Sequence, residues 1–527
     1  TSYPSPERPR ARSSRLPPPE SSEGGIGPGA MEAAFGPGSP IFSQTTERLS
    51  RIFAQARHVP PVAARFREWH RCWKDVHDTD ALAKGLAEGS AEGSGEAPGE
   101  TSFIHQTYLA LLARLIARRF VAPRHSISNS EELLEVINVD YFSRRGIGNF
   151  GEGDVFSWLP LEPRWELDLD ESVLETVRGL ADSLAAHDFT DASPGILDGL
   201  YRQMVRDSSV TPRWLAEYIL EEELGLGDNP GPSLLDPSCG TGTFLCAAIG
   251  SVSRAVARRG GDQVDVLFES PEKIRGMDRD PLAVALARLN YLLALGDLVQ
   301  QEHPSFLLPV YMADADRIPE AQNSGTDDQV VVVATPVGDF PLPGPVIADP
   351  MMLDWLLGRL TNYMDGAQLR LHSQSEDLAV QEVMNAYYNY LTAAKPRTPV
   401  PDALTPQQAD TLLETAGALV RLHLRGEGTL WLHMVQNMAA PAIFSSLGFD
   451  RLAGCSDAGL FETRSAAYLR PGGRAAMLTP SVEQTPESAL VVTGPERSVR
   501  LLVEGGPIPN DRSWTDAKSQ VRVVERS

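Results

Sequence analysis

The sequence predicts an α/β fold with a doubly wound, mostly parallel sheet, preceded by a helical region. Beyond Pro232, short apolar runs that end in acidic residues or glycine alternate with stretches of helical periodicity. Strands that alternate with helices are typical of parallel sheets with crossover helices. Before Pro232, apolar residues recur mainly at helical spacing. The chain has 527 residues, more than one hydrophobic core usually serves, so we expect several structural units.

Six apolar runs carry the strand prediction. Each is short, rich in apolar residues and followed by a turn or a helical stretch. The runs are residues 233–236, 273–278, 308–314, 329–334, 449–454 and 473–480.

Composition divides the chain into six parts. The first 40 residues are rich in Pro, Ser and Gly and bury too little apolar surface to order themselves. Because residue 1 is not Met, Met31 is a candidate start of the native chain. We expect a disordered tail at 1–40, a helical segment at 41–84, a flexible Gly/Ser/Ala/Glu linker at 85–100, a helical N-terminal domain at 101–205, an α/β core at 206–484 and a C-terminal extension at 485–527.

The longest apolar run, at 109–121, is interrupted by Arg114, Arg118 and Arg119. Apolar residues recur at helical spacing from Phe103 onward, so this run predicts an amphipathic surface helix with one buried stripe. No run approaches the roughly 20 apolar residues that a membrane-spanning helix needs.

Charge and cysteine content narrow the classes of function. The formal net charge of −23 argues against a surface adapted to nucleic acid as a whole, since Lys and Arg supply most non-specific affinity for phosphates. A local basic groove remains compatible with DNA. The four cysteines form no CxxC or Cys/His cluster of metal-ligand spacing, so we expect no metal site. With no signal peptide in the sequence, we expect a reduced, cytoplasmic protein.

The most specific motif is the decapeptide 236–245, Asp-Pro-Ser-Cys-Gly-Thr-Gly-Thr-Phe-Leu, between a predicted strand and a predicted helix. Ligands of open α/β sheets bind beyond the carboxyl ends of the strands, where glycines let a ligand approach the backbone. The loop has no Gly-Lys-Ser/Thr, which disfavours a phosphate cradle, and no GxGxxG, which disfavours a dinucleotide. A strand-to-helix turn without a ligand is the plainer alternative.

This decapeptide resembles the first cofactor motif of S-adenosylmethionine-dependent methyltransferases. Its Asp-Pro-x-Cys form is similar to that of the adenine-specific DNA methyltransferases of bacterial restriction-modification and phage-defence systems. The resemblance implies a Rossmann-like methyltransferase core at 206–484 and S-adenosyl-L-methionine as the cofactor. It also implies that Gly240 and Gly242 lie under the methionine and sugar of the cofactor, while Asp236, followed by Pro237, organises the loop.

Acidic residues also end the next two predicted strands. Asp278 is placed to accept hydrogen bonds from both ribose hydroxyls, although a strand-end Asp can also be the N-cap of the following helix. In the family, the acid that ends the third strand bonds the adenine amino group. The resemblance favours Asp314 for this role over Asp316, which could instead cap the next segment.

Two flanking elements extend the resemblance over roughly residues 103–480. Thr211 and Pro212 resemble the Thr-Pro helix start that contacts the methionine end of the cofactor in these enzymes. Proline early in a helix is common, however, and Arg-Asp-Ser-Ser-Val at 206–210 replaces the family's Gly-Glu-Tyr-Tyr. Residues 468–480 match the family's Pro-Gly-Gly element and following strand, whose role is structural.

The family's catalytic tetrad, Asn/Asp-Pro-Pro followed by an aromatic residue, is missing. Its first residues bond the target amine, and its ring stacks on a base taken out of the DNA helix. The strand expected to carry it, 449–454, continues into Cys-Ser-Asp at 455–457. Asp349 and Pro350 keep half of the motif, and a turn that opens a helix is the preferred interpretation there. Because little sequence remains for a target-recognition domain, the chain resembles a truncated or internally deleted member.

Two hypotheses of function follow from the resemblance. The first is a DNA methyltransferase that transfers a methyl group to adenine N6 in restriction-modification or phage defence, with double-stranded DNA and other defence subunits as partners. The second is a degenerate, catalytically inactive member that still binds the cofactor and serves as a scaffold or subunit. A methyltransferase acting on a small molecule or a protein is a weaker third option. The sequence assigns no catalytic residue.

Overall fold

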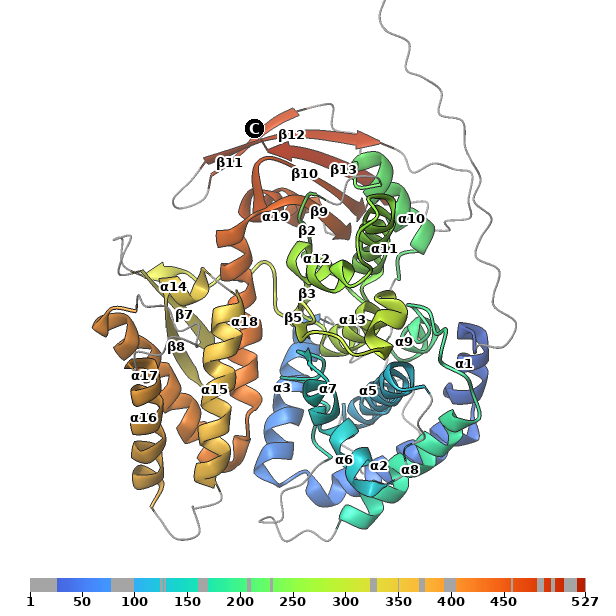
Figure 1. Ribbon diagram of the computed structural model, residues 1–527, viewed down its shortest axis with the longest axis vertical. Helices are drawn as coiled ribbons and strands as arrows, with labels where there is room; N and C mark the ends of the chain where they lie inside the picture. The colour runs from blue at the N-terminus through green and yellow to red at the C-terminus, as the bar shows by residue number, and fades with distance from the viewer. Residues whose placement is uncertain are drawn as a thin grey trace, which may run out of the picture.

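The computed structural model consists of a mostly parallel β-sheet, a layer of N-terminal helices and a lobe inserted between two strands of the sheet (Figure 1). It describes residues 26–76, 99–123, 127, 129–159, 169–205, 210–227, 231–322, 329–348, 350–368, 375–392, 404–455, 458–480, 488–493, 498–506 and 519–526.

The sheet has eight strands, five of which run parallel. From the edge inward the parallel strands are β5 (Val310–Met312), β3 (Ile274–Asp278), β2 (Leu234–Asp236), β9 (Phe449–Cys455) and β10 (Leu469–Pro480). Three antiparallel strands from the predicted C-terminal extension continue the sheet beyond β10. They are β13 (Ser519–Arg526), β12 (Ser498–Gly506) and β11 (Ser488–Thr493).

Helices connect the parallel strands, as the alternation in the sequence predicts. Three of them pack on one another and link β2 to β5, namely α11 (Thr243–Arg258), α12 (Asp265–Lys273) and α13 (Pro281–Ala294), the last followed by the turn η3 (Gly296–Gln300). Two more flank β9 and contact each other, namely α18 (Leu430–Leu447) and α19 (Ala458–Tyr468). From β2 the chain continues to β3 and β5 on one side of β2, and later returns to β9 on the other side of β2. The predicted α/β class with a mostly parallel sheet is confirmed.

The apolar run 329–334 does not belong to this sheet, contrary to our expectation. It forms β7 (Val330–Thr335), which pairs antiparallel with β8 (Gly338–Pro343) and with β6 (Ala321–Gln322) in a separate three-stranded sheet. Two residues separate β7 from β8, enough for a hairpin, whereas a parallel connection needs a dozen residues or more. The short turn thus dictates antiparallel pairing.

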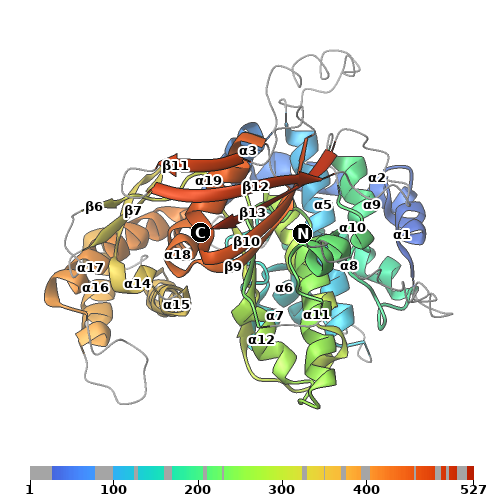
Figure 2. The same ribbon diagram turned by 90° about the horizontal axis from the view of Figure 1, so that it is seen from above.

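This small sheet is part of the insertion lobe, which we define as the described residues between 321 and 427. Figures 1 and 2 show the lobe at one side of the molecule, with α18 between it and the parallel strands. Its helices are α14 (Gly344–Ile347), α15 (Pro350–Gln368), α16 (Glu376–Thr392), α17 (Pro406–Leu422) and the π-helical turn η4 (His423–Glu427).

The N-terminal helices form the other flank of the molecule. They are α1 (Pro28–Phe35), α2 (Pro40–Ala56), α3 (Pro60–Val76), α5 (Glu100–Val121), α6 (Ser130–Ile137), α7 (Asp140–Arg144), α8 (Asp170–Ala185), α9 (Asp198–Met204) and α10 (Arg213–Tyr218), which continues as the π-helical turn η2 (Ile219–Glu223). A short strand pair, β1 (Ile147–Gly148) with β4 (Phe306–Leu307), ties this layer to the core. Helix α1 lies within the predicted tail, where Met31 and Phe35 are fully buried. Most of the predicted linker, 85–98, lies outside the described residues.

Helix α5 is a central buried helix, and the prediction of a surface helix with one buried stripe is wrong. Apolar residues on every side of α5 are buried, and so are Arg114 and Arg118. Arg114 donates to Asp154 Oδ2 (2.6 Å), the Ile137 carbonyl (2.6 Å) and Ser157 Oγ (2.8 Å). An arginine can be buried when its guanidinium is fully hydrogen-bonded and paired, and the sequence alone gives no sign of such partners.

None of the helices that the structure describes has the length and apolar character required to cross a membrane.

Replacement of Arg114 by alanine should destabilise the protein strongly. The buried Asp154 carboxylate would lose its cationic partner, a change that typically costs about 3–5 kcal/mol. Arg48→Ala is the control, because its partner Glu175 is 3.9 Å away and both side chains are at least half exposed, so that about 0–1 kcal/mol is expected. Chemical denaturation of the two variants checks this, and equal shifts would contradict the assigned role of Arg114.

Candidate functional site

The decapeptide forms a glycine loop at the carboxyl end of β2, where it leads into α11. Gly240 (φ +53°) and Gly242 (φ +90°) both adopt backbone conformations that favour glycine. A Cβ on Gly240 would have no atom within 4 Å, so this residue faces open space. A Cβ on Gly242 would lie 3.3 Å from Ala287 of α13, and its absence lets the loop pack closely on that helix. At Gly240 the loop therefore exposes its backbone to open space, and at Gly242 it packs against α13.

Asp278, at the tip of β3, holds the glycine loop in place. Its Oδ2 accepts a hydrogen bond from the Gly240 amide (2.9 Å), and its Oδ1 accepts one from the Asp280 amide (2.9 Å). The N-cap of α13 is Asp280, whose side chain accepts from the Leu282 amide at 2.9 Å. The following helix is therefore capped by Asp280 and not by Asp278, which was one of the two roles considered for Asp278. Burial raises the pKa of Asp278, and the two backbone hydrogen bonds oppose that rise.

Asp236, the last residue of β2, is almost completely buried beneath the loop. Its Oδ1 accepts from the Ser238 amide (3.1 Å), whereas its Oδ2 is buried and has no hydrogen-bond partner among the described residues. Burial raises the pKa of Asp236 to about 8, and the nearby carboxylate of Asp278 adds to the rise. Gly454 of β9 lies against Asp236, and a Cβ at this position would overlap with Oδ1.

An arginine from α19 joins the glycine loop to the segment after β5. Arg464 is buried and forms a two-pronged ion pair with Asp316, from Nε to Oδ1 and from Nη2 to Oδ2, each 2.9 Å. Its Nη1 donates to Ser238 Oγ (3.2 Å). Four residues later, the Tyr468 hydroxyl donates to the Ala315 carbonyl (2.6 Å). Asp316 is therefore an anchor for α19, a role that differs from the cap of the next segment suggested by the sequence.

Asp314 lies two residues beyond β5, and its side chain is partly exposed. Its Oδ1 accepts from the Asp316 amide (3.0 Å), and its Oδ2 is 3.4 Å from Nε of the exposed Arg317. The carboxylate also lines a cavity of about 780 Å³ between the carboxyl end of β5, α3, β7 and α18. Of the two candidate acids, Asp316 is held by a buried cation, while Asp314 faces open volume.

This cavity combines apolar walls with a few charged groups. Its lining includes Met312, Val333, Met434 and Met438 as apolar side chains and Arg71, Arg279, Arg317, Glu320 and Asp339 as charged ones. Pockets that bind small molecules have this character, apolar surface with a small number of polar groups that fix orientation. The insertion lobe supplies the wall opposite the sheet through β7.

Thr211 and Pro212 lie at the tip of β9, next to the glycine loop. Thr211 Oγ1 is 3.3 Å from Sγ of Cys455, the last residue of β9. The Cys455 carbonyl accepts a hydrogen bond from Ser238 Oγ of the loop. Pro212 is the N-cap residue of α10. The Thr-Pro segment therefore closes the end of the site opposite Asp314.

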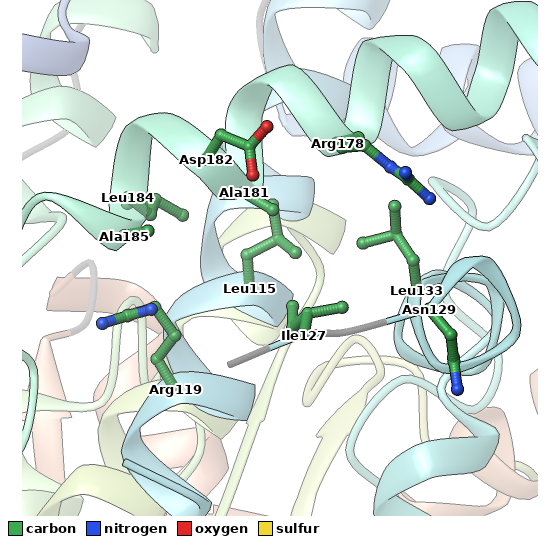
Figure 3. Close-up of a pocket in the computed structure, with 10 residues that line it drawn as sticks. All are labelled: Leu115, Arg119, Ile127, Asn129, Leu133, Arg178, Ala181, Asp182, Leu184 and Ala185. Carbon is green, nitrogen blue, oxygen red and sulfur yellow. The ribbon is translucent and has the colours of Figure 1, made fainter. Parts of the chain in front are cut away.

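Two other cavities lie away from this edge. One, of about 580 Å³, is lined by residues 138–140, 143, 151–154 and 157 together with Arg65 and residues of α15 and α18. The other, of about 300 Å³, lies between α5, α6 and α8 (Figure 3). In Figure 3, Arg119 and Arg178 lie on opposite sides of that pocket and point in different directions, so they create no concentrated positive charge. Within the described ranges, no group of His, Cys, Asp and Glu side chains is arranged to hold a metal ion.

The structure brings all eight sequence-predicted site residues to one edge of the sheet. They are Thr211, Pro212, Asp236, Pro237, Gly240, Gly242, Asp278 and Asp314. Sequence reasoning missed Arg464, Ser238 and Gly454, because a single Arg in a helix, a Ser inside a motif and a strand-end Gly carry no signal of their contacts. Asp349 of the second candidate catalytic motif lies outside the described residues.

Neither a protein-family model nor a curated protein sequence matches the chain. Three of the ten chains of solved structures that match it illustrate the likeness. They are the ATP-dependent Type ISP restriction-modification enzyme LlaBIII bound to DNA (TM-score 0.35, 9% identity, 92% of this chain), a nuclease-deletion mutant of the Type ISP enzyme LlaGI in complex with a DNA substrate mimic (0.26, 12%, 54%) and a DrdV–DNA complex (0.24, 14%, 53%). The chain spans 28%, 22% and 26% of these proteins, respectively.

Gly454→Ala should destabilise the site far more than an ordinary glycine substitution. The added methyl group would overlap with the Asp236 carboxylate and strain the backbone at φ +148°, for a combined cost of about 2–5 kcal/mol. Gly472→Ala is the matched control, since φ is +76° there but nothing lies within 4 Å of the new Cβ, so that about 1–2 kcal/mol is expected. Denaturation midpoints of both variants test the difference, and an equal cost at the two positions would refute it.

The free energy of unfolding should decrease as pH rises, because of the buried carboxyl group of Asp236. The folded protein holds this proton up to a pKa of about 8, while an unfolded Asp releases it near 4, so its stabilising contribution is present at low pH and is lost as pH rises toward 8. In Asp236→Asn this dependence is absent. The free energy of unfolding of the wild type, minus that of the variant, should fall by up to about 1.4 kcal/mol per pH unit between pH 5 and 8. A difference that stays constant over this range would contradict the assignment.

Proposed function

We propose that this chain is the S-adenosylmethionine-dependent core of an adenine-specific DNA methyltransferase of the bacterial restriction-modification or phage-defence type. One observation carries the proposal. The adjacent parallel strands β2 and β3 end in Asp236 and Asp278 at one glycine loop, and Asp314 follows the next strand, β5, two residues beyond its end; the strand order reverses between β2 and β9. Open α/β sheets bind their ligands at such a switch point. In this proposal the sheet is a doubly wound, Rossmann-like methyltransferase core.

The residues at this edge fit a sulfonium nucleoside. Gly240 provides open backbone, and the Asp278 carboxylate beside it can accept hydrogen bonds from a ribose diol. Asp314 faces a cavity large enough for a purine and can accept a hydrogen bond from an exocyclic amine. The carboxylates of Asp278 and Asp314 favour a ligand that carries positive charge. When bound, the cofactor would supply an electrophilic methyl group, and the chain's own residues would bind and orient it.

The remaining predicted residues would hold the methionine end. Thr211 and Pro212 lie beside Cys455 at the tip of β9, on the far side of the loop from Asp314. Gly242 lets the loop approach α13 closely, which fixes the start of α11. The cofactor would thus extend from the β9 tip, across the glycine loop, to the cavity beyond β5.

A non-catalytic member of the same family is the second candidate function, and one observation favours it. In the family, acceptors at the end of the strand equivalent to β9 bond the target amine. Here the Cys455 carbonyl at that end already accepts the Ser238 hydroxyl, and the Arg464 guanidinium donates to the same hydroxyl. A cation beside the carbonyl disfavours an incoming amine. In that role the chain would bind the cofactor as a scaffold or subunit, and a partner would supply recognition or chemistry.

Calorimetry with S-adenosylmethionine tests the cofactor site. The wild type should bind, and Asp278→Ala should weaken binding about 10- to 100-fold, since hydrogen bonds to a charged group contribute about 1.5–3 kcal/mol each. Asp297→Ala, an exposed acid remote from the loop, is the control and should bind like the wild type. Absence of binding by the wild type would overturn the proposal.

Labelled methyl transfer separates the two candidate functions. Incorporation of methyl from the cofactor into adenine N6 of mixed genomic DNA would establish the enzyme. Binding of the cofactor without incorporation would support the non-catalytic member.

A further inference from the structure

The edge strand β5 is held by side chains where a neighbouring strand would otherwise be. It is the last strand of the parallel part of the sheet, so its outer backbone groups have no strand to pair with. Unpaired backbone groups that are buried need other partners. Three side chains from separate parts of the chain provide them, namely Asn149, Arg288 and Asn437, which we call the β5 clamp.

Each member of the clamp contacts the backbone of β5 or of the residues just before it. Asn149 Nδ2 donates to the carbonyls of Leu308 (2.7 Å) and Val310 (3.1 Å). Arg288 Nε donates to the same Val310 carbonyl (3.0 Å). Asn437 Oδ1 accepts the amide of Met312 (2.7 Å), the last residue of the strand. The clamp therefore holds the outer edge of β5 at the Val310 carbonyl and at the Met312 amide.

The clamp residues also hold one another. Arg288 Nη2 donates to Asn149 Oδ1 (2.9 Å) and to Asn437 Oδ1 (3.3 Å), and Asn437 Nδ2 donates to the His433 carbonyl of α18 (2.8 Å). Arg288 and Asn437 are each 2% exposed. A buried network whose members are all hydrogen-bonded is rigid, because any displacement breaks several bonds at once.

The clamp ends where the cavity begins. Met312, whose amide Asn437 holds, lines the cavity together with Asp314, two residues further along. Met434 and Met438 on the same helix as Asn437 line it too. Asn437 thus connects the wall of the cavity on α18 with the strand end that carries the acid.

We propose that Asn437 is a positioning residue for purine selection. By fixing the end of β5, it sets Asp314 where the carboxylate accepts a hydrogen bond from the exocyclic amine of the bound nucleoside. This inference rests on the proposed function. Misplacement of Asp314 would reduce the preference for a 6-amino purine over a 6-oxo purine more than it reduces affinity in general, because only that preference depends on the acceptor.

The experiment compares two ligands by calorimetry, S-adenosylhomocysteine and S-inosylhomocysteine, which carries oxygen in place of the 6-amino group. The wild type should prefer the adenosyl ligand at least about tenfold. Asn437→Leu, which removes the acceptor for Met312, should lower this preference at least about fivefold. Asn437→Asp keeps an acceptor oxygen and should restore most of it.

Gln436→Leu is the matched control. Gln436 neighbours Asn437 on α18 and is also buried, but its hydrogen bonds among the described residues go to His433 Nδ1 and the Asp354 carbonyl and not to β5. The ligand preference of this variant should equal that of the wild type. Melting temperatures of all variants report general damage, which would weaken both ligands equally.

Each outcome has one meaning. If the wild type binds neither ligand, the proposed function fails. If the wild type discriminates and Asn437→Leu discriminates equally, the positioning role is wrong. If Asn437→Leu does not fold, Asn437→Ala replaces it, since this smaller side chain also removes the acceptor for the Met312 amide. A preference unchanged in that variant also refutes the role.

Discussion

The hydrogen bond from the Gly240 amide to the Asp278 carboxylate is the contact on which the site depends. It connects the loop after β2 to the tip of β3 and so fixes the position of the loop at the carboxyl end of the sheet. Gly240 can take the required backbone conformation because it has no Cβ, and Gly242 lets the same loop pack on α13. Without this hydrogen bond, the loop would not be held at a fixed position relative to the acids of the neighbouring strands.

The acids at this edge are tolerated for different physical reasons. Asp236 is buried and keeps its proton to a pKa of about 8, so it adds little negative charge at neutral pH. Asp316 is neutralised by Arg464. Asp278 accepts two backbone amides, and Asp314 lies near solvent and Arg317. Asp236 and Asp316 therefore serve structure, Asp278 holds the loop while its oxygens keep further acceptor capacity for a ligand, and Asp314 lines the cavity.

The sequence predicted the elements whose signals are local. The alternation of apolar runs and helices gave the α/β class, and the spacing of Asp236, Gly240 and Gly242 located the loop between strand and helix. An acid at the end of each run could be assigned to a strand tip without coordinates, because parallel strands share their carboxyl edge. This explains why the sequence could place Asp278 and Asp314 at this edge of the sheet.

Long-range partners could not be predicted. The arginines of α5 suggested a surface helix, since nothing in the sequence marks Asp154 as the partner of Arg114. The valine run of β7 had the composition of a parallel strand, and only its two-residue turn to β8 decided for a hairpin. Arg464 pairs with Asp316, which is 148 residues away in the sequence, and such contacts depend on the tertiary fold.

The cavity beside Asp314 has walls from three parts of the chain. The sheet and α18 supply the side that carries Asp314, the insertion lobe supplies β7, and the N-terminal layer supplies Arg71 of α3. A site assembled in this way responds to movements of either flank, because its volume depends on how both pack against α18. The lobe is therefore a structural part of the candidate site, although its composition alone gave no such indication.

Hydrogen–deuterium exchange of the full chain with and without S-adenosylmethionine tests the central claim most directly. The account predicts slower exchange of amides in the glycine loop, at the tip of β3 and after β5, which are far apart in the sequence and meet only at this edge of the sheet. Unchanged exchange at these three segments with saturating cofactor, or protection confined to other parts of the chain, would contradict it.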